Sequence, residues 1–258
     1  MATKRKIRPW RAALVAGVGA LGLIAAETPG ASAVTGTISE FPVTTAFSGP
    51  DKITAGPDGN LWFTEMVANK IGRVTTAGVV TEFPVTTASS GPTGITAGPD
   101  GNLWFTESFA NKIGRITTAG VVTEFPVTTA SSGPIGITAG PDGNLWFTEM
   151  VAGKVGRITA AGVVTEFPVT TALSGPIAIT AGPDGNLWFT ESLAGKVGRI
   201  TTAGVVTEFP VTTASSGPIG ITAGPDGTLW FTEMVAGKVG RITTAGVVTE
   251  FPVTTESS

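Results

Sequence analysis

Three kinds of side chain are missing from this sequence, which contains no cysteine, no histidine and no tyrosine. Without cysteine there is no disulfide and no thiol nucleophile, so apolar packing has to hold the fold together. Without histidine, the chain lacks the side chain that exchanges protons most easily near neutral pH and that commonly activates a serine. Enzymes that depend on a cysteine nucleophile or on a serine–histidine pair are therefore excluded.

The first 33 residues have the three regions of a secretory signal peptide. Residues 1–11 carry five basic side chains and no acidic one, and an apolar run follows over residues 12–26. That run is shorter than the about 20 residues that a membrane-spanning helix needs, which argues against an uncleaved anchor. Ala31, Ser32 and Ala33 form a small-x-small cleavage pattern. We expect a signal peptide over residues 1–33 and an extracellular protein.

The remaining residues, 34–258, are acidic. They contain 11 basic and 18 acidic side chains, a net charge of −7. An acidic exported domain is a poor candidate for binding nucleic acid or anionic lipid. We therefore expect no nucleic-acid partner, and no membrane contact beyond the signal peptide.

A repeat runs through the whole of this domain. The decapeptide GPDGNLWFTE at residues 56–65 returns every 42 residues, with Thr228 replacing asparagine in the fifth copy. In the unit over residues 132–173, β-branched and aromatic residues gather into short runs bounded by glycine and proline, which predicts strands at 137–139, 145–148, 155–159 and 163–169. Four short strands per unit is the size of one propeller blade. The fold class is therefore all-β, a β-propeller of five 42-residue four-stranded blades.

The turns and the apolar strand of each unit support this prediction. Pro141, Asp142 and Gly143 suit a type I turn closed by a left-handed glycine, and Gly162 is placed to close a second hairpin. In the apolar run LWF, Trp146 should face one neighbouring blade, whereas Leu145 and Phe147 should face the other.

The fourth strand of the unit occurs once too often. Its motif, seen as VTEFPV in each repeat, also occurs as ISEFPV at residues 38–43, ahead of the first complete unit. The domain is thus five near-identical repeats plus one extra N-terminal strand. Two alternatives stay open: a monomeric ring of five blades with one competing strand, which we expect, or a partial propeller completed by another chain.

The combination of GPDGNLWFTE, NKIGRIT, a glycine turn and VTEFPV resembles the repeat of the streptogramin B lyases, also called virginiamycin B lyases, over residues 37–258. The resemblance implies a seven-bladed propeller that confers antibiotic resistance as a magnesium-dependent C–O lyase, opening a cyclic depsipeptide by elimination with acid/base residues that include histidine. This chain has five units and no histidine. No catalytic residue is therefore assigned.

Differences between the copies gather on one face, where the loop from the second to the third strand of each unit and the connection from its fourth strand to the next unit emerge. We expect a small molecule or glycan to bind there. The alternative is that the loop sequences differ between copies only because packing constrains loops least. The variable pairs are Asp51-Lys52, Thr93-Gly94, Ile135-Gly136, Ile177-Ala178 and Ile219-Gly220 before the first strand, and Met66-Val67, Ser108-Phe109, Met150-Val151, Ser192-Leu193 and Met234-Val235 in the loop.

One glutamate closes the second strand of every blade. As candidate ligand-binding residues we name Glu65, Glu107, Glu149, Glu191 and Glu233. If they converge near the axis, then Glu149, Glu191 and Glu233 would hold magnesium or calcium, which prefer oxygen ligands. The alternative is local ion pairing, for example of Glu149 with Lys154 or Arg157.

Two functions follow from these observations. The first is a secreted non-catalytic ligand-binding or scaffold module, which five near-identical units favour because a single catalytic centre needs blades that differ. The second is a lyase that runs on glutamate and lysine instead of histidine, with Glu149, Glu233, Lys154 and Lys238 as the candidates.

Overall fold

The computed structural model describes residues 38–254, so the expected signal peptide lies outside the described residues. One compact unit begins at Glu40. Within the described range the chain forms twenty strands in five sheets, and no helix long and apolar enough to span a membrane is found there.

Each sheet is an antiparallel meander of four consecutive strands, and we number these sheets blade 1 to blade 5 along the chain. The strands are β1 (Pro50–Ala55), β2 (Leu61–Glu65), β3 (Lys70–Val74), β4 (Val80–Pro84), β5 (Pro92–Ala97), β6 (Leu103–Glu107), β7 (Lys112–Ile116), β8 (Val122–Pro126), β9 (Pro134–Ala139), β10 (Leu145–Glu149), β11 (Lys154–Ile158), β12 (Val164–Pro168), β13 (Pro176–Ala181), β14 (Leu187–Glu191), β15 (Lys196–Ile200), β16 (Val206–Pro210), β17 (Pro218–Ala223), β18 (Leu229–Glu233), β19 (Lys238–Ile242) and β20 (Val248–Pro252).

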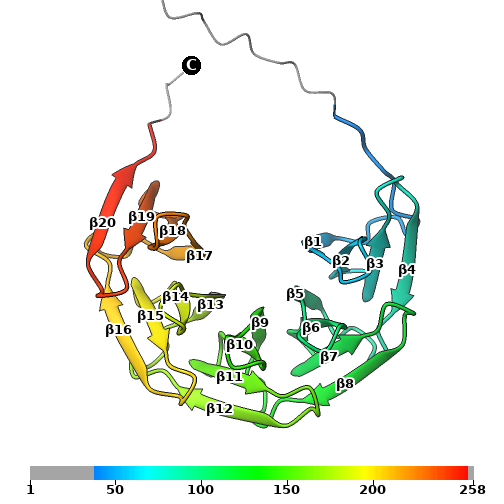
Figure 1. The fold of residues 1–258 in the computed structure, drawn as a ribbon, viewed down its shortest axis with the longest axis horizontal. Coiled ribbons are helices and arrows are strands. Elements are labelled where there is room, and N and C mark those ends of the chain that lie inside the picture. The colour runs from blue at the N-terminus through cyan, green and yellow to red at the C-terminus, as the bar shows by residue number, and fades with distance from the viewer. Residues whose placement is uncertain (1–37, 255–258) are drawn as a thin grey trace, which may run out of the picture. The chain divides into compact units, whose positions relative to one another are not determined.

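The blades follow one another around an axis, as Figure 1 shows. The first strand of each blade lies innermost and the fourth lies on the outside. The predicted all-β propeller of five four-stranded blades is confirmed, and in the third blade each of the four strands overlaps its predicted range.

Both predicted hairpin turns form. Gly143 has a φ of 74°, and the Gly140 amide donates a hydrogen bond of 2.7 Å to the Asn144 carbonyl oxygen. A side-chain bond adds to this turn, because the indole Nε1 of Trp146 donates to Asp142 Oδ1 at 3.0 Å. Gly162 closes the second hairpin with a φ of 86°. Only glycine adopts this left-handed region without steric cost, which explains its place in each turn.

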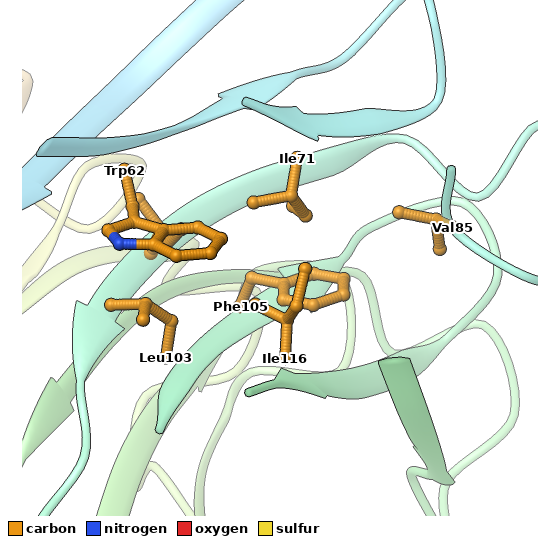
Figure 2. Close-up of a cluster of buried hydrophobic side chains, with 7 residues drawn as sticks. Trp62, Ile71, Val85, Leu103, Phe105 and Ile116 are labelled. Atoms are coloured by element: carbon orange, nitrogen blue, oxygen red, sulfur yellow. The ribbon is translucent and has the colours of Figure 1, made fainter. Parts of the chain in front are cut away.

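The core lies between the blades and not within one of them. Figure 2 shows Trp62 and Ile71 of blade 1, and Val85 in the connection that follows this blade. These side chains face side chains of blade 2, among them Leu103 and Phe105. The next interface repeats this arrangement, with Leu145 and Phe147 packed in the cluster that contains Trp104. Trp146 packs in the following cluster instead. The predicted division of the LWF run between two neighbours is confirmed.

Four such clusters join the five blades in sequence. Within the described residues no corresponding cluster joins blade 5 to blade 1, and a gap separates these two blades in Figure 1. Ile53 and Leu61 on the free face of blade 1 are accordingly 61% and 42% exposed. Residues 40–254 thus form an open arc and not the closed ring that we expected.

The predicted extra strand at residues 38–43 is wrong, because this segment adopts no strand. A fourth strand forms its ladder with the third strand of the same blade, as β12 does with β11. The N-terminal segment has no third strand beside it among the described residues. Its backbone therefore lacks the partner that defines a strand.

Candidate functional site

Five short segments that are far apart in the sequence line one cavity at the axis. The first strand of each blade places its opening residues there, and the cavity measures about 300 Å³, at the lower end of the range for small-molecule sites. Its lining consists of Asp51, Lys52, Ile53, Thr93, Gly94, Ile95, Ile135, Gly136, Ile137, Ile177, Ala178, Ile179, Ile219, Gly220 and Ile221. This set includes all five variable pairs that the sequence analysis placed before the first strands. In the structure each pair lies within its first strand, because these strands begin earlier than predicted.

The wall of this axial cavity is chemically uneven. Blade 1 contributes the charged pair Asp51 and Lys52, whose Oδ1 and Nζ atoms lie 3.6 Å apart. Blades 3, 4 and 5 contribute isoleucines at the position of Asp51, namely Ile135, Ile177 and Ile219. A ligand in the cavity would therefore meet an apolar wall on one side and a charged wall on the other.

Blade 2 adds a buried polar cluster at this end of the axis. The hydroxyl oxygen of Thr93 lies 2.9 Å from that of Thr106 and 2.8 Å from that of Ser108. Ser108 in turn donates to the carbonyl oxygen of Pro134 at 2.6 Å. No other blade has threonine at this place, so the five repeats are equivalent in fold but not at the axis.

The five glutamates that close the second strands lie elsewhere. None of them lines the axial cavity, and each is buried, with Glu149 0% and Glu233 1% exposed. Within residues 38–254, no three histidine, cysteine, aspartate or glutamate side chains lie close enough to hold a metal ion. Glu149, Glu191 and Glu233 are thus not brought together, and each is buried at the end of the second strand of its own blade, away from the axial cavity. The residues that the structure describes do not fit the expected magnesium or calcium site.

Burial dominates the chemistry of these glutamates. It raises the pKa of Glu149 to about 8, and the nearby negative charge of Glu166 adds to the increase. Among the described residues, neither carboxylate oxygen of Glu149 has a hydrogen-bond partner of good geometry, although Ser132 and Glu166 lie near enough to influence its pKa. Glu191 has a pKa raised to about 8 for the same reasons. These carboxyl groups are therefore largely protonated at neutral pH.

The expected ion pairs of Glu149 are wrong. Lys154 Nζ lies 3.5 Å from Glu166 Oε2 on the outer strand and donates to the Thr129 hydroxyl at 2.6 Å. Thr129 donates to Glu166 through both its amide and its hydroxyl group, each at 3.0 Å. Burial alone would raise the pKa of Glu166, but these hydrogen bonds outweigh it and lower that pKa.

Arg157 is engaged in a different contact. Its guanidinium lies over the rings of Trp146 and Phe167, at 5.6 and 5.7 Å from their centroids, and it donates to the Thr202 carbonyl oxygen of the next blade. Sequence analysis missed the role of the outer glutamates and of these arginines. The sequence did contain a signal for the outer glutamates, because a lysine and a glutamate recur 12 residues apart in every unit, as at Lys154 and Glu166.

The fold and its repeat match one family of proteins along nearly the whole described chain. A sequence model of the virginiamycin B lyase family matches residues 36–258. The chain belongs to this family. A crystal structure of virginiamycin B lyase from Staphylococcus aureus is 45% identical to this chain, and the match covers 86% of this chain and 76% of the lyase, with a TM-score of 0.84.

Two further structures of virginiamycin B lyase type are similar to this chain. A structure described as a streptogramin B lyase is 41% identical, with a TM-score of 0.81 over 84% of this chain and 73% of its own. The other is a catalytically inactive histidine-to-alanine variant of the S. aureus lyase with quinupristin. It is 44% identical, with a TM-score of 0.82 over 85% of this chain and 75% of its own. The family resemblance read from the repeat is confirmed.

Proposed function

We propose that this chain is an exported, non-catalytic ligand-binding member of the virginiamycin B lyase family. The observation that carries the proposal is the absence of histidine from the entire sequence. In the S. aureus lyase, replacing one histidine by alanine gives a protein described as catalytically inactive but found with quinupristin. A family member without histidine is therefore suited to binding and poorly suited to elimination.

The buried glutamates do not replace histidine as a base. A pKa of about 8 suits proton abstraction near neutral pH, as the lyase alternative requires. A general base must nevertheless come within hydrogen-bond reach of the proton that it removes. Glu149 is 0% exposed, so no substrate reaches its carboxylate in this structure. Burial thus supplies the required pKa and at the same time removes the required access.

The axial cavity is the proposed binding site. Its apolar isoleucine wall and its charged Asp51–Lys52 wall suit an amphipathic small molecule. In this proposal the affinity for the ligand comes from several weak contacts with the first strands of different blades.

The test is to titrate purified protein with quinupristin by calorimetry and to analyse the same mixture by mass spectrometry. We expect saturable binding with no linear product. Changing Ile135→Ser on the apolar wall should weaken binding by roughly tenfold, whereas Val151→Ser, an exposed position outside the cavity, should not. No binding at all would overturn the proposal. A linear product that is lost in Glu149→Gln would establish the lyase alternative.

Export is part of this proposal and rests on residues 1–33 alone. Mass spectrometry of protein collected from the medium should give a chain that begins at or near Val34. Protein that stays inside the cells would contradict export, and a secreted chain that retains Met1 would contradict cleavage after Ala33.

A further inference from the structure

Residues 40–45 lie against blade 1 in the way that the fourth strand of each blade lies against the blade that follows. The ring of Phe41 lies against Gly78, and the fourth-strand phenylalanines of blades 1 to 4 lie against the equivalent glycine of the next blade. The Thr45 hydroxyl donates to Glu82 Oε2 at 2.6 Å, a hydrogen bond that recurs at every later junction between blades. This segment therefore takes the place of the fourth strand of a blade ahead of blade 1.

The apolar cluster on the free face of blade 1 is only partly filled. At the junction of blades 1 and 2, the first of the two blades contributes a tryptophan of its second strand, an isoleucine of its third, a phenylalanine of its fourth and a valine of the following connection. On the free face, Phe41 and Val43 take the last two of these places and line a hollow of about 310 Å³ with Ile53 and Phe63. Among the described residues nothing takes the first two places. Leu61 is accordingly 42% exposed, whereas its counterpart in every later blade is fully buried.

The free face of blade 5 is the opposite half of such a junction. Trp146 and Val155 of blade 3 are completely buried against blade 4, but the equivalent Trp230 and Val239 of blade 5 are only half-buried. Val253, in the connection after the fourth strand, is 55% exposed. These side chains are the same in type as those of blade 3, so this face suits the first face of another blade.

One hydrogen bond recurs at every junction between blades. A threonine of the second strand donates to a carbonyl oxygen of the first strand of the next blade, as seen at Thr64, Thr106, Thr148 and Thr190. Thr232, their counterpart in blade 5, is exposed and donates no such bond within the described part of the chain. On blade 1 the acceptor position is Asp51. Its side chain differs from those of the later blades, but the acceptor is a main-chain carbonyl group that every residue has.

The repeat gives the composition of the piece that would fill both faces. The fourth-strand motif occurs at residues 38–43 and once in each blade, whereas the first three strands occur only once in each blade. A piece that joins blade 5 to residues 40–45 therefore begins with a first strand and ends with a third. The five blades already take up most of one turn in Figure 1, which leaves no room for a second complete copy of this chain. The match covers 76% of the S. aureus lyase, and the remainder of that lyase is longer than one of these units.

We propose that a separate polypeptide of this repeat completes the ring, and that it carries one complete unit followed by the first three strands of another. Its first blade packs on the free face of blade 5. Its last three strands take residues 40–43 as their fourth strand, so one blade is shared between two chains by β-strand addition. The tryptophan of that blade fills the hollow on blade 1 and stacks on Phe41, as Trp62 stacks on Phe83 with 5.5 Å between ring centroids. Of the two alternatives that the repeat leaves open, this is the propeller completed by another chain.

The probe is a polypeptide with the sequence of residues 174–243, which is one unit and the first three strands of the next. We expect it to form a one-to-one complex with the purified protein in sedimentation velocity. Hydrogen exchange at the Val43 amide should slow in the complex, because the equivalent Val85 amide donates to the Asn69 carbonyl oxygen beside the third strand of its own blade. Exchange that stays unchanged in the complex would contradict a shared blade.

Variants of the two faces test where the probe binds. Phe41→Asp beside blade 1 and Val253→Asp on blade 5 each place a charge in the contact and should weaken binding by at least roughly tenfold. Val151→Asp is the matched control, since Val151 is 67% exposed but lies on neither face, and it should bind like the wild type. Equal binding by all three variants would overturn the proposal.

Exchanging the fourth strand between the two chains gives the decisive result. A probe of residues 174–253 brings its own fourth strand, which competes with residues 40–45, so it should bind the full chain more weakly than the shorter probe does. For a chain that starts at Ala46 this preference should reverse. Binding of neither probe, or binding without the reversal, would overturn the proposal. If the separate probe does not fold, residues 171–243 are joined directly to Thr254, and a Val43 amide that exchanges as fast as in the original chain would overturn it there.

Discussion

The hydroxyl group of Thr148 in blade 3 donates a hydrogen bond of 2.6 Å to the carbonyl oxygen of Ile177 in blade 4. The same hydroxyl accepts a bond of 2.9 Å from the Gly136 amide within its own blade. One fully buried side chain thus ties a strand to its neighbour in the sheet and a blade to its neighbour in the arc.

Replacing Thr148 by valine should destabilise the protein by about 1–3 kcal/mol, because the change leaves a buried amide and a buried carbonyl group without their partner. Thr232→Val is the matched control, since its side chain is exposed and bonds no next blade in residues 38–254. Urea unfolding at low protein concentration measures both. Equal losses in the two variants would contradict the role assigned to the bond between blades.

Gly156 should not tolerate a methyl group. It stands opposite Phe147 in the sheet, and a Cβ atom at this position would collide with the Phe147 ring. Gly156→Ala should therefore cost about 1–3 kcal/mol of unfolding free energy through overpacking. Gly143→Ala makes no such contact but has to adopt a φ of 74°, which should cost only about 1 kcal/mol. A larger loss at Gly143 than at Gly156 in thermal unfolding would contradict this ordering.

The stability of the fold should fall as the pH rises from about 4.5 to about 8. Burial raises the pKa of Glu149 and Glu191 from 4.5 to about 8 in the folded state. Over this interval the folded protein holds protons that the unfolded chain has released, so their contribution is complete below pH 4.5 and is lost as the pH approaches 8. Urea midpoints across this range measure the slope.

Glu149→Gln should flatten that slope, because an amide does not titrate, and the variant should gain stability relative to the wild type near pH 8. A stability that rises with pH in the wild type would show that the buried glutamates are ionised in the fold. Such a result would contradict the assignment of their protonation state.

Lysine should not substitute for Arg157. The planar guanidinium lies over two aromatic rings and reaches the Thr202 carbonyl oxygen at 3.2 Å, which an ammonium group cannot do at once. Arg157→Lys should cost about 1–2 kcal/mol. Arg241→Lys in blade 5 has the ring contacts without a next blade in the described chain, so its cost should be smaller. Equal midpoints of unfolding for both variants would contradict a contribution from the bond between blades.

Much of the local architecture followed from the sequence by itself. Turns with glycine at fixed offsets and β-branched runs depend on backbone geometry over a few residues, so the strands and hairpins of each unit were predictable. The LWF run also determined which side chains face which neighbour, because successive residues of a strand point to opposite faces. The absence of histidine, which carries the proposed function, is likewise a property of composition alone.

Only the tertiary structure decided which of these residues meet. The glutamates of the second strands share one position in every repeat, which suggested a convergent site, but each is buried at the end of a strand in its own blade, where burial raises its pKa. The pairs at the start of the inner strands converge instead, since the first strand of each blade lies nearest the axis. The sequence did not predict that the arc stays open. The rotation from one blade to the next depends on how the large side chains of neighbouring blades pack, and this rotation, not the number of repeats, sets how many blades complete a turn.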